Sequence, residues 1–592
     1  MTATVDTPPP AEVARGNPPL LAVLLEALLR EDALGLRTAA TLSRRPDLDD
    51  GGWLHLPTQD GAGLLVPVGG GGLLADHSVR DASVRRADTF AVLTSPDAVL
   101  ALLTPGDDAE AIEGVAALRQ ECRDAQAAEA LAAAARPGLF ARLADAPTAT
   151  GARGALALDG LAAGRRHPLY PTSAARTGLT VDDLAGHAPE TGNRFPLHWV
   201  ALPWTALTCS GTRPACWPTC ADVGLDAGYD ATHLPVPVHP LTAAGPLLDV
   251  IDRAGLTATA VLAPRALLDV VPTLSMRTVA LAEQPELHVK LPLATSTLGR
   301  LNRRTLSPDS LQDGAAVQRL LEELVAADPA LRDRVLHADE TTFVHAGTDL
   351  LAALVRRWPA GLDQARVVPV AALAARLADG RTVAQQVADA SYGGDLVALV
   401  ETYLALLVDV HVRLWLVHGI ALEAHQQNTA VVVDDDGGGP RLRLLLKDDD
   451  GPRLDREVLA ASRAGAPAPV LADGRLWARD VGELCDVFTT ISLHLCAASV
   501  ISALTDGDRA RRVHLFAALR GHLERAADEH ADRRDVALLR ARVLEAERLP
   551  VKGMITAGTL LPKTRTAARD VNKHYAGTAP SYLPRTSLSG RG

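Results

Sequence analysis

The pattern of apolar and polar positions predicts a chain that mixes helices with strands. Apolar residues recur at helical spacing in residues 18–45 and in the Ala-rich segment 95–143, and residues 311–385 and 480–548 are also predicted to be mainly helical. Residues 53–68 instead alternate between apolar and polar and are broken by Gly and Asp, which predicts strands around a turn. The fold class that follows is α+β, with mixed or antiparallel sheets and substantial helix.

Residues 396–417 are apolar and long enough to cross a membrane. Four ionisable side chains interrupt them: Glu401, Asp409, His411 and Arg413. A lipid-facing span rarely tolerates such residues, so we predict a buried helix of a soluble protein, with Asp395 as its N-cap. The N-terminus lacks a basic stretch followed by an apolar one, and we therefore expect no signal peptide and a cytoplasmic location.

Charge and cysteine content narrow the possible functions. The 592-residue chain has a formal net charge of −12 and no basic stripe, which argues against a nucleic-acid partner. Its six cysteines are too few for a disulfide framework. Cys209, Cys216 and Cys220 cluster in sequence but lack an evident fourth zinc ligand, so we predict a structural role for them.

A strand-turn-strand unit carries the strongest chemical signal. Residues 429–433 are rich in β-branched residues, residues 434–440 read as a turn, and residues 441–446 read as a second strand. A hairpin brings the two outer ends of its strands together. Polar residues stand at both of those ends: Glu423, His425, Gln427, Asn428, Lys447 and Asp448.

These residue types suit the binding of a metal–nucleotide complex. Mg²⁺ on a triphosphate takes one or two carboxylates, and Glu423 and Asp448 fit that role. Gln427 and Asn428 could hold phosphate or ribose. His425 could stabilise charge on a reacting carboxylate or on the α-phosphate.

Two alternatives remain open for the hairpin. Protein kinases and related phosphotransferases place a catalytic Asp five residues before an Asn, then a hairpin, then a metal-binding Asp. Here Glu423, not Asp, stands five residues before Asn428, and no Gly-rich loop followed by a strand lysine precedes it. A kinase-like small-molecule phosphotransferase is therefore the alternative enzyme, and a merely polar turn between buried strands is the structural alternative.

The segment Glu423-Ala424-His425-Gln426-Gln427-Asn428 resembles the palm-domain signature of the IucA/IucC family of NRPS-independent siderophore (NIS) synthetases. Further blocks agree in order and rough spacing, so that the similarity spans about residues 160–560. These blocks are Arg166-His167-Pro168-Leu169-Tyr170-Pro171 with Arg176-Thr177-Gly178-Leu179, Pro237-Val238-His239-Pro240, Lys290-Leu291-Pro292-Leu293 with Thr295-Ser296-Thr297 and Arg303-Arg304, and Leu549-Pro550-Val551-Lys552-Gly553.

The resemblance implies a three-lobed enzyme. Residues 1–155 would form a thumb-like domain, residues 156–385 a fingers-like domain with ATP and carboxylate contacts, and residues 386–592 a palm-like domain with the hairpin. Such enzymes use ATP and Mg²⁺ to adenylate citrate, a citrate derivative or a related acid, with release of pyrophosphate. An amine or alcohol then displaces AMP. A homodimer is expected from the family.

The resemblance also assigns roles to individual residues. Arg and Lys side chains are needed where a polycarboxylate meets a triphosphate. The catalytic candidates are His425, Arg304 and His167. The ATP-binding candidates are His167, Arg176, Lys290, Ser296, Thr297, Arg303, Gln427 and Asn428. The metal candidates stay Glu423 and Asp448, and no residue stands out as the base for the attacking amine.

Three positions depart from the family pattern. Tyr170 stands where a second His is usual, Ala174 where a Lys is usual, and the spacing from Thr295 to Arg304 is shifted. An altered acid substrate would explain these changes. So would a catalytically inactive binding homologue, which is the non-enzyme alternative.

Overall fold

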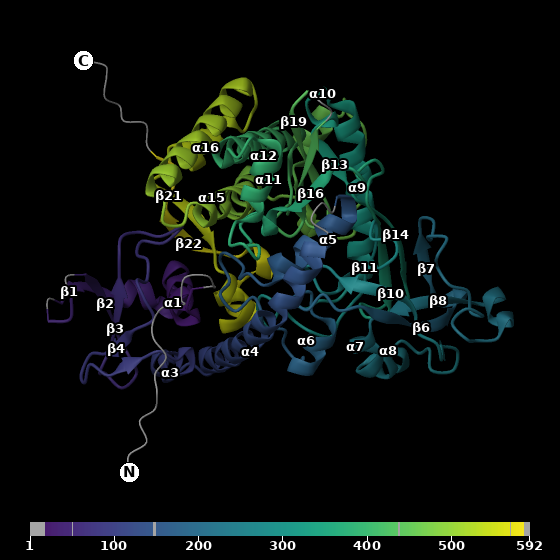
Figure 1. The fold of residues 1–592 in the computed structure, drawn as a ribbon, viewed down its shortest axis with the longest axis horizontal. Coiled ribbons are helices and arrows are strands. Elements are labelled where there is room, and N and C mark those ends of the chain that lie inside the picture. Colours follow the sequence, from purple (N-terminus) through teal and green to yellow (C-terminus); the bar gives the residue numbers. More distant parts are fainter. Residues whose placement is uncertain are drawn as a thin grey trace, which may run out of the picture.

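The computed structural model describes residues 18–45, 47–49, 51–145, 150–435, 438–568 and 570–584. Three main sheets and the helices between them form an α+β fold, which confirms the predicted class (Figure 1). The division into three lobes with boundaries at 155 and 385 stays a prediction.

The N-terminal part is a five-stranded antiparallel meander in the order β1-β2-β3-β4-β5. The alternating residues 53–68 form its second and third strands around a turn, as predicted, and Leu56 pairs with Leu64. Its elements are α1 (Leu20–Arg30), α2 (Leu36–Ala39), β1 (Thr41–Arg44), β2 (Gly52–Leu56), β3 (Leu64–Val68), β4 (Val84–Arg86) and β5 (Val92–Leu93). The predicted helical segment 95–143 follows as α3 (Pro96–Leu103) and the 37-residue α4 (Ala109–Asp145).

A nine-stranded sheet fills the middle of the chain, in the order β7-β14-β15-β12-β11-β10-β6-β8, with β9 paired to β6. Its strands are β6 (Phe195–Pro203), β7 (Thr208–Ser210), β8 (His233–Val238), β9 (Val261–Leu262), β10 (Leu267–Pro272), β11 (Thr278–Leu281), β12 (Leu287–Lys290), β14 (Asp339–His345) and β15 (Ala352–Arg357). The helices of this region are α5 (Gly151–Ala163), α6 (Val181–His187), α7 (Pro240–Ala244), α8 (Leu247–Arg253), α9 (Pro308–Ala327) and α10 (Pro329–Arg332).

The prediction that residues 311–385 are mainly helical is wrong beyond α10. Strands β13 (Val335–His337), β14, β15 and β16 (Arg366–Pro369) occupy much of that segment. Their short apolar runs are largely buried, and periodicity alone does not separate such a strand from a buried helix.

The predicted hairpin lies in a four-stranded sheet with the order β13-β19-β18-β16. Strand β18 (Thr429–Asp435) pairs antiparallel with β19 (Pro440–Leu446), with Thr429 opposite Leu446. The helices around it are α11 (Val383–Ser391), α12 (Leu396–His418), α13 (Arg456–Ser462), α14 (Val481–Val487), the π-helical segment η7 (Phe488–Ala498), α15 (Ser499–Leu504), α16 (Arg509–Glu529) and α17 (Val536–Leu539). Two short ribbons complete the region, β17 (Ile420–Ala421) with β20 (Arg453–Leu454) and β21 (Arg548–Lys552) with β22 (Tyr575–Pro580).

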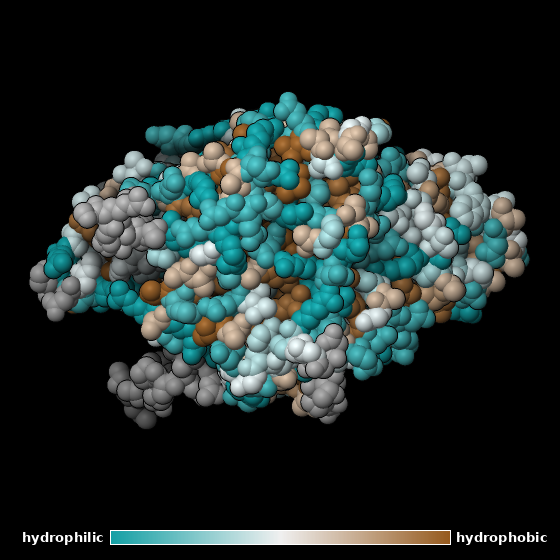
Figure 2. All heavy atoms as spheres, turned by 90° about the horizontal axis from the view of Figure 1, so that it is seen from above, coloured by the Kyte–Doolittle hydropathy of each residue, from teal (hydrophilic) through white to brown (hydrophobic). Residues whose placement is uncertain are grey.

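The apolar segment at 396–417 forms the buried helix α12, as predicted. The Asp395 carboxylate accepts from the backbone N–H of Ala398 at 3.0 Å, and the helix ends at Gly419 with φ 67°. In the described part of the chain, one segment has the length and composition of a membrane span, and it is Val481–Leu504 rather than α12, with mean hydropathy 1.8. Because 89% of it is buried inside the protein, we assign it to the core. Polar residues cover most of the face seen in Figure 2.

Candidate functional site

A cavity lies between the C-terminal end of α5, loops of the nine-stranded sheet, the start of the hairpin and the segment η7–α15. Its volume is about 1350 Å³, including space open to solvent. Seven of the predicted site residues line it: His167, Arg176, Thr297, Arg304, Glu423, His425 and Gln427. The remaining predicted residues do not line it: Lys290, Ser296, Arg303, Asn428 and Asp448.

The hairpin brings its two outer ends together, as predicted. The backbone N–H of Lys447 donates to the carbonyl of Asn428 at 3.0 Å. The Glu423 carboxylate lies so close to Gly451 that a Cβ there would be 2.5 Å from Glu423 Oε2. A glycine is therefore needed at 451 for the carboxylate to reach this position.

Both cavity histidines present a donor to the cavity. His167 Nδ1 accepts from the backbone N–H of Leu169 (3.2 Å) and of Tyr170 (3.1 Å), and His425 Nδ1 accepts from that of Gln427 (3.3 Å). A backbone N–H can only donate, so the proton of each neutral ring sits on Nε2. Burial lowers the pKa of His167 to about 3 and that of His425 to about 4, which keeps both rings neutral at physiological pH.

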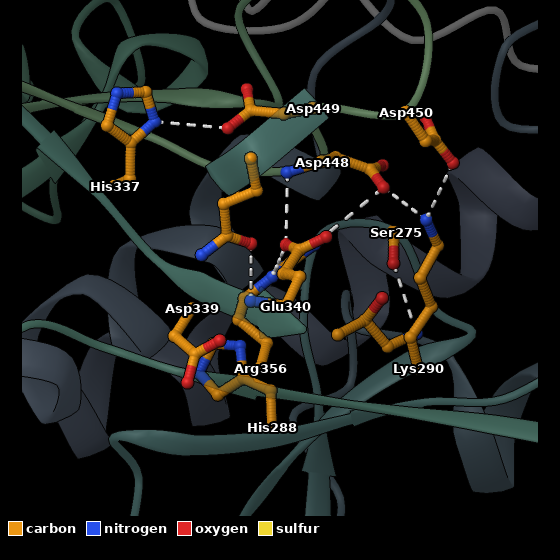
Figure 3. Close-up of polar contacts among 12 residues, drawn as sticks. Ser275, His288, Lys290, His337, Asp339, Glu340, Arg356, Asp448, Asp449 and Asp450 are labelled. Carbon is orange, nitrogen blue, oxygen red and sulfur yellow. Dashed lines mark hydrogen bonds and ion pairs between the residues drawn. The ribbon is translucent and has the colours of Figure 1, made fainter. Parts of the chain in front are cut away.

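An ion network joins the end of the hairpin to the nine-stranded sheet (Figure 3). Lys290, on β12 and 2% exposed, contacts the Asp448 carboxylate directly and lies 3.4 Å from that of Asp450. Arg356, on β15, binds Glu340 and lies 4.0 Å from Asp448. The backbone N–H of Asp448 donates to Glu340 at 3.0 Å.

This network fixes the charge and the backbone of Asp448. Burial alone would raise the pKa of its carboxyl, but Lys290, Arg356 and Arg277 hold that pKa well below its usual range. The residue has φ 67°, a conformation that non-glycine residues rarely adopt outside functional sites and turns. The anion is thus held in one place at the edge of the site.

The donor types fit Mg²⁺, although each predicted ligand is already paired with a lysine. Lys573 Nζ lies 2.7 Å from Glu423, while Lys290 contacts Asp448. Among the described residues no three His, Cys, Asp or Glu side chains gather as a metal cluster. Magnesium on a nucleotide needs only one or two carboxylates, because phosphates and waters complete its octahedron. Glu423 and Asp448 therefore remain the candidate ligands.

The adjacent residues Arg303 and Arg304 differ in their position relative to the cavity. Arg304 is half-buried and lines the cavity, and its buried Nε has no hydrogen-bond partner among the described residues. Burial, with Arg277 adding to it, lowers the pKa of Arg304 to about 9. Arg303 has a 64% exposed side chain, 3.9 Å from Asp349. Only Arg304 is in a position to bind a ligand in the cavity.

Several cavity residues were not predicted as site residues. Lys552, from the block at 549–553, lines the cavity, and burial lowers its pKa to about 8, opposed by the charge of Glu423. Ser275 and Asn302 also line it. Arg277 lies two residues after Ser275, and its Nη1 donates to the Thr305 carbonyl at 2.6 Å. The block at 549–553 was a signal for Lys552, whereas nothing in the sequence singled out the other three.

The Tyr170 departure lies outside the cavity. Its buried hydroxyl donates to Glu121 at 2.8 Å and lies 3.0 Å from the hydroxyl of Thr559. Glu121 belongs to α4 and Thr559 to a C-terminal π-helical turn, so Tyr170 joins distant parts of the chain. Its role is therefore in packing.

Ala174, which stands where the family pattern has a Lys, contacts Arg176 through its backbone carbonyl. Arg176 Nη1 donates to this carbonyl at 2.6 Å, and Nη2 lies 3.3 Å from Glu190. Much of the guanidinium is thus used to hold its own loop, although it lines the cavity. Its predicted part in ATP binding stays a prediction.

The cysteine cluster at 209–220 lies away from the cavity lining. Cys209 is exposed, Cys216 is half-buried and Cys220 is buried, and all three are free thiols. The structural role predicted for them is untested.

Comparison with known proteins bears on this site. Residues 157–375 match the family model of the IucA / IucC family, and residues 398–572 match that of the ferric iron reductase FhuF-like transporter. Staphyloferrin B synthase of Staphylococcus aureus is 24% identical over 365 residues, which cover 57% of this chain and 61% of the relative. The uncharacterized protein y4xN of Sinorhizobium fredii is 27% identical over 325 residues, 47% of this chain and 48% of the relative. The matches thus span about half to three-fifths of these curated relatives.

The likeness in fold extends much further. The ATP-bound aerobactin synthetase IucA of Klebsiella pneumoniae superposes with a TM-score of 0.70 at 17% identity, covering 96% of this chain and 99% of that one. The resemblance that the motifs predicted is therefore confirmed: the chain is related to the IucA/IucC-type siderophore synthetases, by a family match over residues 157–375 and by fold over nearly its whole length.

Proposed function

We propose that this protein is an ATP-dependent ligase that adenylates a carboxylic acid and joins it to an amine or alcohol in siderophore-type biosynthesis. The observation that carries the proposal is the convergence, in one cavity, of two neutral imidazole donors (His167 and His425), the Arg304 guanidinium and Lys552 beside Glu423. Preorganised donors of this kind stabilise charge that develops during acyl and phosphoryl transfer. The family match and the ATP-bound structural relative support the same reading.

In the first step, a carboxylate oxygen of the acid attacks the α-phosphorus of ATP. A bond forms between them, the bond to the β-phosphate oxygen breaks, and pyrophosphate leaves. Arg304 binds the acid or the α-phosphate, and the Nε2–H groups of His167 and His425 donate to the negative charge on phosphorus. Lys290, Ser296, Thr297, Gln427 and Asn428 are the further proposed ATP contacts.

In the second step, the amine nitrogen or alcohol oxygen attacks the acyl carbon. The new amide or ester bond forms, the acyl–phosphate bond breaks, and AMP leaves with its electron pair. The nucleophile also loses a proton, and Lys552 is the cavity group whose pKa, about 8, lies nearest neutrality. When Mg²⁺ is bound, at Glu423 and Asp448, it supplies charge neutralisation for the phosphates.

Product analysis tests the proposal. Purified protein is incubated with Mg²⁺, ATP, a panel of carboxylic acids including citrate, and hydroxylamine as a general nucleophile. We expect acid-dependent release of AMP and pyrophosphate. Release of ADP would favour a phosphotransferase, and no turnover with any acid and amine would favour an inactive binding homologue.

The remaining expectations are also proposals. The three-lobed division, action in the cytoplasm, and a homodimer are inferred from the relatives. Light scattering on the purified chain tests the dimer: a mass near 62.1 kDa would contradict it.

A further inference from the structure

One side chain of the cavity has no role in the scheme above. Arg165 stands two residues beyond the end of α5 and lines the cavity. Its Nη1 is buried without a hydrogen-bond partner, and no ion pair joins its guanidinium to any residue that the structure describes. A guanidinium N–H group that has given up water without finding an acceptor lowers the stability of the fold. Such an arrangement is expected where a ligand supplies the missing acceptor.

The arginines near Arg165 do not share this feature. Arg166 is engaged by Glu129 and by the carbonyl of Pro18. Arg376 is exposed and donates to the carbonyl of Gly380 at 2.9 Å. Neither of the other two has an unpaired, buried Nη group, so Arg165 alone of the three is poised for a ligand within the described residues.

The charges that act on Arg165 differ from those that act on His425. Burial, with the charge of Arg376 adding to it, lowers the pKa of Arg165 to about 10, so it stays protonated at neutral pH. In contrast, the charges of Glu423, Lys552, Asp448 and Arg304 each act on the pKa of His425. None of them perturbs Arg165.

Part of the cavity wall is apolar. Helix α5, which ends two residues before Arg165, packs against the 3₁₀ turn at Val370–Ala372, and small and aliphatic side chains from around this turn and from the segment η7–α15 line the cavity. These residues are Val370, Ala371, Ala374, Leu495, Val500 and Ala503. The Gln426 amide fixes the wall, because it donates to the carbonyl of Leu495 (2.5 Å) and to the hydroxyl of Ser499 (2.7 Å). An aliphatic chain suits such a surface.

We propose that Arg165 binds a carboxylate carried at the far end of an aliphatic chain by one of the two organic substrates. This inference rests on the proposed ligase function and names the class of substrate. The source is either a dicarboxylic acid whose other carboxylate reacts, or an amine that also carries a carboxylate. A planar guanidinium binds a carboxylate through two parallel hydrogen bonds, which gives both affinity and selection against uncharged analogues.

The test compares paired substrates in the wild type and in Arg165→Met, which keeps an unbranched side chain and removes the charge. The acid arm uses short α,ω-dicarboxylates and their half-amides, and the amine arm uses ω-amino acids and their amides. We expect Arg165→Met to lower kcat/KM about 10- to 100-fold for the carboxylate member of one arm, and to leave its amide almost unchanged. The arm that responds identifies the source. Arg376→Met is the matched control and should not alter the ratio.

A stability measurement separates this role from a structural one. Because the unliganded guanidinium has no partner, Arg165→Met should leave the melting temperature of the free protein unchanged or raise it. The same short dicarboxylates and ω-amino acids should raise the melting temperature of the wild type and not that of the variant. Equal losses on both members of each pair, or a lower melting temperature of the free variant, would overturn the proposal.

The two proposals fail in different ways. If the wild type adenylates an acid but Arg165→Met does not change discrimination, the ligase function stands and the Arg165 assignment falls. If no acid is adenylated, the thermal shift still decides the assignment: protection by a carboxylate that depends on Arg165 supports it, and lack of protection by any of these carboxylates overturns it.

Discussion

Asp448→Asn tests the ion network of Asp448 with Lys290 and Arg356 most directly. Asn keeps the shape of the side chain and tolerates φ 67° better than most residues. The backbone N–H that donates to Glu340 is also kept. The change therefore removes one negative charge from between Lys290 and Arg356 and little else.

The size of the effect follows from the distances. Two charges 4.0 Å apart, the separation of Arg356 and Asp448, interact by ~4 kcal/mol at an effective dielectric constant of about 20. Lys290 is closer still, but Asp450, 3.4 Å from Lys290, stays to compensate part of its charge. Breaking a buried ion pair by removing one partner costs roughly 3–5 kcal/mol. We expect a loss near the lower end, about 3 kcal/mol, in the free energy of unfolding.

Urea unfolding at neutral pH measures this loss, with Lys290→Met and the double variant completing a cycle. The double variant should be less destabilised than the sum of the two single variants. The pKa of Asp448 is lower in the folded than in the unfolded state, so its contribution is present above about pH 4 and fades as the pH falls below that value. A loss below about 1 kcal/mol at pH 7 would refute the reasoning from buried ion pairs.

Three further predictions concern single side chains. Arg304→Lys should raise the KM for the acid roughly 10-fold or more in steady-state kinetics, because lysine lacks the planar guanidinium that binds a carboxylate through two hydrogen bonds. Arg303→Lys should change nothing, and equal effects of the two substitutions would place the acid elsewhere. Tyr170→Phe should lower the free energy of unfolding by about 1–3 kcal/mol in urea, because Glu121 loses a donor, and a changed KM for the acid would contradict a packing role. If neutral Lys552 accepts the proton of the nucleophile, kcat for amide formation should rise as the pH increases through about 8, and Lys552→Arg should remove this step. An identical profile in the variant would exclude Lys552.

Local signals in the sequence predicted the elements that hold the site. The β-branched run before a Gly-rich turn gives the hairpin β18–β19, and the ionisable residues within 396–417 mark α12 as a protein core helix. The hairpin prediction also placed Glu423 and His425 correctly at its outer end, since strand pairing brings those ends together.

Contacts between residues far apart in sequence could not be predicted from the sequence. Lys573 contacts Glu423 although the two residues are 150 positions apart in sequence. No local sequence pattern marks such a pair. The helical prediction over 311–385 failed because strands buried on both faces lose the alternating pattern. The sequence also did not show which of the adjacent residues Arg303 and Arg304 lines the cavity. Only the folded structure shows that it is Arg304.

The central claim is that the acid is activated as an acyl-adenylate, and an isotope-transfer measurement tests it directly. The acid that supports turnover is labelled with ¹⁸O in its carboxylate and incubated with the protein, ATP, Mg²⁺ and the amine. Attack of the carboxylate on the α-phosphorus, followed by loss of AMP, predicts one labelled oxygen in AMP for each amide formed. Label in inorganic phosphate together with release of ADP, or amide formed while AMP stays unlabelled, would contradict the account.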